Sequence, residues 1–135
     1  MAFGDTSLGR VILDSGRGTN PGTVVLAEAC KAGDVLGYSS GWKRALATVS
    51  SVIQARLVAL KDGIIGESIP VSPNPVVSGY SGATPGNPVY VAEGTDNGKI
   101  TDAVPTTSGD ANVVIGFALT ATTVQFNISR ADTTA

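Results

Sequence analysis

Glycine and proline interrupt this chain at short intervals along nearly its whole length. The 135 residues include 17 glycines and 7 prolines, and clusters of turn-forming residues recur roughly every ten residues. The intervals hold short apolar runs rich in valine and isoleucine, which suit strands better than helices. We therefore predict an all-β domain of about eight to ten short strands, arranged as a sandwich or a barrel.

The pattern of apolar residues locates individual strands. In Val124–Ser129, Val, Phe and Ile alternate with Gln, Asn and Ser, which is typical of a strand with one buried face. The mainly apolar segment Val113–Leu119 predicts a buried strand. Val89–Ala92 predicts a strand that turns at 95–99 and returns from Ile100.

The middle of the chain is ambiguous, because its leucines and valines also keep a helical spacing. Residues 52–60 alternate, however, and the following Asp62-Gly63 pair suits a type I′ hairpin turn. We predict a strand over 52–60, a return strand over 64–71, and a helical turn around 44–50.

Three prolines follow in quick succession, at 70, 73 and 75. Proline has no backbone N–H to donate to a neighbouring strand. The segment that holds them is therefore expected to be a sheet edge or an extended crossover.

The two ends of the chain differ from its body. Residues 1–22 carry frequent glycines around one apolar run, and predict an extended N-terminal arm that becomes ordered against a neighbour. The β domain is expected over 23–129 and a polar C-terminal tail over 130–135. Removal of residues 1–17 should then leave the domain folded. The candidate interface residues are the arm's apolar side chains and the single tryptophan: Phe3, Leu8, Val11, Ile12, Leu13 and Trp42.

Charge and hydropathy exclude several kinds of partner. The formal net charge is −2, from 9 basic and 11 acidic residues scattered along the chain, with no basic cluster. A nucleic-acid partner is therefore not expected. The chain has no apolar stretch of about 20 residues and no basic, apolar leader, so neither a membrane span nor a signal peptide is expected. Small apolar residues make a thin core, which favours burial completed by partner subunits.

The inventory of reactive side chains makes catalysis improbable. The chain has no histidine and a single cysteine, so triad chemistry lacks its general base. Cys30 is expected to be a buried, unreactive apolar residue. Asp96-Asn97-Gly98 is too short a match to a calcium loop and predicts a plain hairpin turn. We expect no metal or cofactor site, although spacing alone does not exclude a pair of carboxylates that hydrolyses glycosides.

The order of several turn-and-strand motifs resembles the small capsid decoration, or cement, proteins of tailed bacteriophages. The resemblance covers residues 23–129, and each motif by itself is weak. The ordered motifs are Ala32–Tyr38, Gln54–Leu60, Lys61–Gly63, Gly86–Val91 and Val114–Leu119.

That resemblance implies a compact β-barrel-like or β-tulip domain that forms a homotrimer. Proteins of this kind sit on the outer surface of an expanded phage head and clamp neighbouring major capsid subunits. It further implies synthesis in the host cytoplasm, a final location on the virion, and no catalytic residues or cofactors. The arm over 1–22 is expected to reach onto the capsid or an adjacent copy.

Two other functions fit the same composition. One is a different structural part of a phage virion, such as a head-fibre base or a tail module. The other is a small carbohydrate-binding β module that uses Trp42 and Tyr80. An enzyme is the least favoured function.

Overall fold

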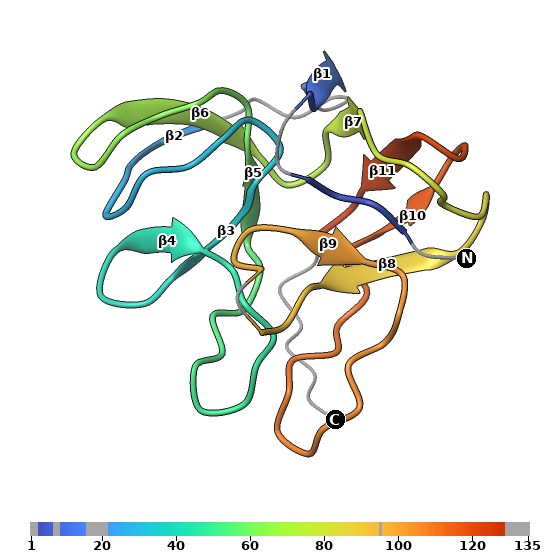
Figure 1. The fold of residues 1–135 in the computed structure, drawn as a ribbon. Coiled ribbons are helices and arrows are strands. Elements are labelled where there is room, and N and C mark those ends of the chain that lie inside the picture. The colour runs from blue at the N-terminus through green and yellow to red at the C-terminus, as the bar shows by residue number, and fades with distance from the viewer. Residues whose placement is uncertain (1–2, 7–8, 16–21, 95, 129–135) are drawn as a thin grey trace.

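The structure is a computed structural model that describes residues 3–6, 9–15, 22–94 and 96–128. Within these residues the chain forms eleven β-strands in two sheets, and no helix. Every pair of adjacent strands in the two sheets is antiparallel. Figure 1 shows the two sheets beside each other. The predicted compact all-β domain is confirmed, as two sheets rather than one closed barrel.

The six-stranded sheet contains the first strand of the chain and the last one. Its order is β1-β7-β11-β10-β8-β9, so the chain's first strand lies at one edge. The strand bounds are β1 Val11–Asp14, β7 Val76–Ser78, β8 Pro88–Val91, β9 Ile100–Thr101, β10 Gly116–Ala118 and β11 Thr123–Phe126. The predicted hairpin that returns at Ile100 is confirmed by the pairing of β8 with β9.

The five-stranded sheet is built mainly from the first half of the chain, in the order β2-β6-β5-β3-β4. The residue directly after β2, Leu26, forms a parallel bridge with Trp42 in β4 at the opposite edge. This bridge wraps the sheet around its own apolar interior. The strand bounds are β2 Gly22–Val25, β3 Val35–Tyr38, β4 Trp42–Arg44, β5 Leu57–Ala59 and β6 Ser68–Ser72.

Two apolar clusters form the core. The larger one lies between the sheets, where Val35 and Val58 of the five-stranded sheet meet Val89, Val124 and Phe126 of the six-stranded sheet. The smaller one fills the interior of the five-stranded sheet, and its buried residues are Leu26, Cys30, Leu36, Ala59, Ile69 and Val71. The five-stranded sheet therefore buries apolar side chains on both faces.

The middle of the chain differs from its prediction. No helical turn forms around 44–50, because Leu46 and Ile53 exchange both backbone hydrogen bonds across a tight turn. The strand predicted over 52–60 is limited to Leu57–Ala59. Ahead of it the backbone of Gln54 crosses close to Gly37. A Cβ at Gly37 would lie 2.1 Å from the Gln54 carbonyl oxygen, so only glycine fits there.

The predicted type I′ turn at Asp62-Gly63 is wrong. The bend lies at 64–67, where Glu67 N–H donates to the Ile64 carbonyl and Gly66 has a φ of 86°. Gly63 instead forms an isolated bridge with Cys30. The return strand begins later than expected, at Ser68.

The edge position expected from the prolines is also wrong for Pro70. This residue lies in β6, which is paired with β2 on one side and β5 on the other. The sheet tolerates it because Pro70 faces Leu60, one residue past the end of β5, where the proline only accepts a hydrogen bond through its carbonyl. Pro73 and Pro75 lie between β6 and β7, in the extended crossover that was predicted.

The continuous buried strand predicted over 113–119 is another correction. Only Gly116–Ala118 is a strand, and Val114, Phe117 and Leu119 are exposed. The alternation predicted for the last strand is confirmed, because Val124 and Phe126 are fully buried while Gln125 between them is not, but the strand ends at Phe126.

The described part of the first 22 residues packs on its own domain. Gly4 bridges to Ser81, and β1 pairs with β7. Phe3 stacks at 5.4 Å against the buried ring of Tyr80. The described part of this segment is extended and contacts its own domain; whether the segment also contacts a neighbouring molecule stays a prediction. We now expect removal of residues 1–17 to destabilise the domain, because it deletes a strand and a buried ring contact.

Candidate interaction surface

The outer face of the six-stranded sheet is the candidate site. The strand register places Phe117 of β10 between Pro88 of β8 and Gln125 of β11. Side chains two residues apart along a strand share a face, so Tyr90 lies on the same side as Pro88. We call this surface the uncharged face. Its residues are Val11, Val76, Ser78, Pro88, Tyr90, Thr101, Phe117, Thr123 and Gln125.

The name reflects a long stretch of sequence without charge. The segments 68–92 and 111–129 contain no Asp, Glu, Lys or Arg. Within the strands of this sheet the single charged residue is Asp14, which pairs with Val76 at the end of the edge strand. A sheet face that meets only water usually carries polar and charged side chains. This one instead resembles the middle of a protein interface, where charge is depleted.

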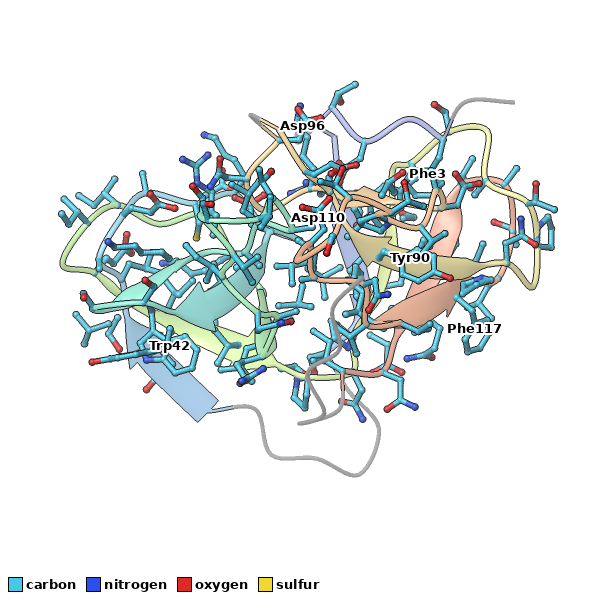
Figure 2. All side chains as sticks on the ribbon, turned by 90° about the horizontal axis from the view of Figure 1, so that it is seen from below. Phe3, Trp42, Tyr90, Asp96, Asp110 and Phe117 are labelled. Atoms are coloured by element: carbon cyan, nitrogen blue, oxygen red, sulfur yellow. The ribbon has the colours of Figure 1, made fainter. Side chains whose placement is uncertain are left out.

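Large apolar side chains and a shallow hollow mark the centre of the uncharged face. Phe117 is 41 % exposed although it lies in a strand with neighbours on both sides. A hollow of about 270 Å³ lies beside it, lined also by Asn74, Gln125 and Asn127. The Gln125 amide is held in place, because its Nε2 donates to the carbonyls of Asn74 and Phe126. Figure 2 shows Tyr90 and Phe117 at the far end of the molecule from Trp42.

The structure separates the six predicted interface residues. Val11 is 53 % exposed and lies on the uncharged face, and Leu13 is exposed at the bulge next to it. Ile12 points the other way and packs against the core. Leu8 lies outside the described residues.

The other two predicted residues lie away from this face. Phe3 packs on Tyr80. Trp42 packs against the interior of the five-stranded sheet and makes an edge-to-face contact with Tyr38 at 5.5 Å. Sequence reasoning missed Phe117 and Tyr90, although the two charge-free segments were a signal that could have found them.

A buried ion cluster fastens the first strand to the rest of the domain. Arg10 donates to both carboxylate oxygens of Asp5, each at 2.9 Å, and also to Asp34. Asp34 Oδ2 accepts from the backbone N–H of Lys31 at 2.8 Å, and Asp5 Oδ2 accepts from that of Ile100 at 3.0 Å. All three charged side chains are almost fully buried. The cluster therefore joins the N-terminal segment to both sheets.

Among the described residues, the Arg10 guanidinium forms ion pairs with two carboxylates, those of Asp5 and Asp34. Burial acts to lower the pKa of Arg10, but the hydrogen bonds and charge of Asp5 outweigh it, and the pKa lies above its ordinary value. Burial raises the pKa of Asp34, against the opposing effect of Arg10. We interpret the cluster as structural, because the side chains of Asp5, Arg10 and Asp34 are all engaged in hydrogen bonds with one another or with the backbone.

Cys30 is buried, as predicted, within the five-stranded sheet. Burial and the charge of Asp34 raise the pKa of its thiol to about 11, so at neutral pH it is protonated and a poor nucleophile. A hollow of about 390 Å³ lies beside it. Its rim carries Lys31 and Arg44 as well as Asp62 and Glu67, and this mixture favours neither an anion nor a cation.

No group of three or more acidic, cysteine or histidine side chains among the described residues is placed to hold a metal. The same part of the chain contains no helix that is long and apolar enough to cross a membrane.

Comparison with known proteins gives no relative. No protein-family model matches this chain, and no curated protein or solved structure matches it either.

Proposed function

We propose that this chain is a structural virion protein that decorates a phage head. It binds the outer surface of the expanded head as a homotrimer and stabilises contacts between major capsid subunits. It is made in the host cytoplasm, uses no cofactor, catalyses no reaction, and binds neither nucleic acid nor membrane. The family resemblance of the sequence motivates this proposal, and the structure contributes one independent argument.

That argument is the uncharged face. It offers exposed apolar groups of Val11 and Phe117 next to fixed amides such as Gln125. Apolar area that is removed from water stabilises a complex by about 25 cal/mol per Å² before the costs of association. Because this face carries almost no charge, copies of it can gather on a lattice without repelling each other. We assign the uncharged face to contacts with the capsid or between protomers.

The energetics of a trimer suit this role. A protein that binds the assembled shell and not its free subunits stabilises the shell by mass action. When three copies are joined, each further contact with the shell becomes intramolecular, so weak contacts add to a strong attachment. The moderate area of one sheet face on each copy is then sufficient for a stable attachment of the trimer to the shell.

The test is co-sedimentation with expanded heads assembled from the major capsid protein of the same genome, together with the molar mass in solution. We expect Phe117→Asp to reduce head binding at least tenfold, since it places a charge in the centre of the face. The control is Ile65→Asp, which changes a side chain that is 68 % exposed in the loop between β5 and β6. This variant should bind as the wild type does.

Other outcomes would redirect the proposal. A monomer that never sediments with expanded heads refutes it. Binding that electron microscopy places on a fibre or tail favours another virion part. The carbohydrate alternative loses one of its two aromatic residues, because Tyr80 is buried against Phe3 and has no free ring face for a sugar. Clear binding on a glycan array would restore it.

A further inference from the structure

Three loops meet at the junction of the two sheets. Ala47 lies in the middle, where its N–H donates to the Ala92 carbonyl and its own carbonyl accepts from Ala111 N–H, both at 2.9 Å. The residues that follow or flank these three alanines therefore lie close together. Figure 2 shows Asp110, on one of these loops, between the two ends of the molecule.

Asp110 is the most buried polar residue of this junction. It is only 1 % exposed. Its Oδ1 accepts a hydrogen bond of 2.6 Å from Val49 N–H, but its Oδ2 is buried and has no hydrogen-bond partner within the described residues. A carboxylate oxygen in such a position is costly unless a donor, a proton or a cation faces it.

A second buried oxygen of the same loop also lacks a partner. Asn112 Oδ1 is enclosed and accepts no hydrogen bond within the part of the chain that the structure describes. Ala111 between the two residues packs into the core.

Glu93 brings a second carboxylate to the junction, on the loop after β8. The loop is fixed here, because Gly94 N–H donates to Thr48 Oγ1 at 2.6 Å. The pKa of Glu93 is raised, first because its carboxyl lies within hydrogen-bonding range of the Asp110 carboxylate, and further by burial and by the Asp110 charge. The two acids therefore lie close together, and no lysine or arginine among the described residues forms an ion pair with either.

We propose that Glu93, Asp110 and Asn112 form a binding site for a divalent cation of the calcium type. Carboxylate and amide oxygens are the ligands that calcium prefers, and water completes its coordination in open sites. The exposed Glu93 leaves the site accessible from solvent. Zinc is disfavoured because the chain has no histidine and its one cysteine is buried inside the five-stranded sheet.

Such an ion would hold the three loops together where the sheets meet. It would replace the repulsion between two carboxylates by attraction of both to one cation. This site lies apart from the hairpin turn Asp96-Asn97-Gly98, and it does not depend on whether the chain binds a phage head.

Thermal unfolding of the full chain at pH 7.5 tests the site. We expect 10 mM calcium chloride to raise the melting temperature by about 5 °C relative to EDTA, if the dissociation constant is on the order of 1 mM. Magnesium chloride at the same concentration should give a smaller rise, because magnesium needs a stricter geometry and gives up its water reluctantly.

Two variants separate the site from a general salt effect. Glu93→Gln keeps the shape of an exposed side chain and should abolish the calcium-dependent rise. Asp96→Asn removes one exposed acid from the same hairpin and should keep it. The proposal is overturned if calcium has no effect, if magnesium acts equally, or if Glu93→Gln responds as the wild type does. A melting temperature that rises on acidification but ignores calcium would show instead that the two acids share a proton.

Discussion

The two sheets of this domain differ in how many of their faces bury apolar side chains. The five-stranded sheet wraps around its own interior and also contributes Val35 and Val58 to the core between the sheets, so both faces serve its own fold. Surface ion pairs surround it, such as Arg44 with Glu28 and Lys61 with Glu67. The six-stranded sheet buries one face and leaves the other exposed and nearly free of charge.

This difference indicates which part of the domain has apolar surface left for a partner and which part has less. The five-stranded sheet buries apolar side chains on both faces and has ion pairs at its rim, although Val25 and Tyr38 at its edges stay exposed. A sheet with one buried face and one uncharged face has surface left for a partner.

Two phenylalanines on neighbouring strands compare the faces of the six-stranded sheet directly. Phe126 is fully buried, so Phe126→Ala should lower the free energy of unfolding by about 3–5 kcal/mol. Phe117→Ala, on the opposite face, should cost less than about 1 kcal/mol. Urea denaturation measures both. Equal losses in the free energy of unfolding would mean that Phe117 belongs to the core and that the uncharged face is not open to solvent.

The buried ion cluster is expected to couple the two sheets. Arg10→Ala leaves the carboxylates of Asp5 and Asp34 buried without their cation and should cost about 3 kcal/mol. The raised pKa of Asp34 lets it take up a proton, so part of this cost should disappear as the pH falls toward 4. Unfolding curves of the variant at pH 7 and pH 4.5 provide the measurement. A cost below 1 kcal/mol at pH 7 would show that the sheets do not need this link.

The thiol of Cys30 reports on the five-stranded sheet alone. With a pKa of about 11 against an ordinary 9, the folded thiol should react with a disulfide reagent at pH 8 about 100-fold more slowly than the unfolded chain. The same pKa shift determines how the stability of the domain changes with pH. The unfolded thiol loses its proton first, so stability is unaffected below pH 9 and falls as the pH rises toward 11. Fast labelling at pH 8 would show that this sheet opens on its own.

The surface ion pairs should matter least. Arg44 and Glu28 are joined at 3.1 Å but both remain partly exposed. Arg44→Ala should therefore cost less than about 1 kcal/mol, and less still in high salt. Melting temperatures in low and high salt are sufficient to check this. A larger loss would mean that the charged rim is part of the fold rather than its solvated border.

Local patterns were enough to predict some elements and not others. The alternation in β11 and the hairpin of β8 with β9 follow from residues within a few positions of each other. The position of Pro70 could not be predicted, because its tolerance depends on where β5 ends. The apolar content of 113–119 suggested burial on both sides. Whether a second layer covers Phe117 is decided by tertiary packing, which local patterns do not contain.

The candidate surface was found only in part for the same reason. Val11 was identified from its apolar run, but Phe117 and Tyr90 come to lie on one face only when β10 pairs with β8. Nothing near Arg10 in the sequence pointed to Asp34, 24 positions away. The apolar residues of the first 14 positions were predicted to contact another molecule. Two of them, Phe3 and Ile12, pack within the chain.

The hydrogen bond from Ile100 to Asp5 has a consequence for synthesis. It joins residues 95 positions apart, and β1 pairs with β7, which in turn pairs with β11, near the end of the described chain. Asp5 and β1 therefore reach all of their native neighbours only after Ile100 and β11 have been synthesised. Contacts of such long sequence separation slow folding, to milliseconds or seconds in domains of this kind. The first strand is consequently fixed in place late in the folding of this domain.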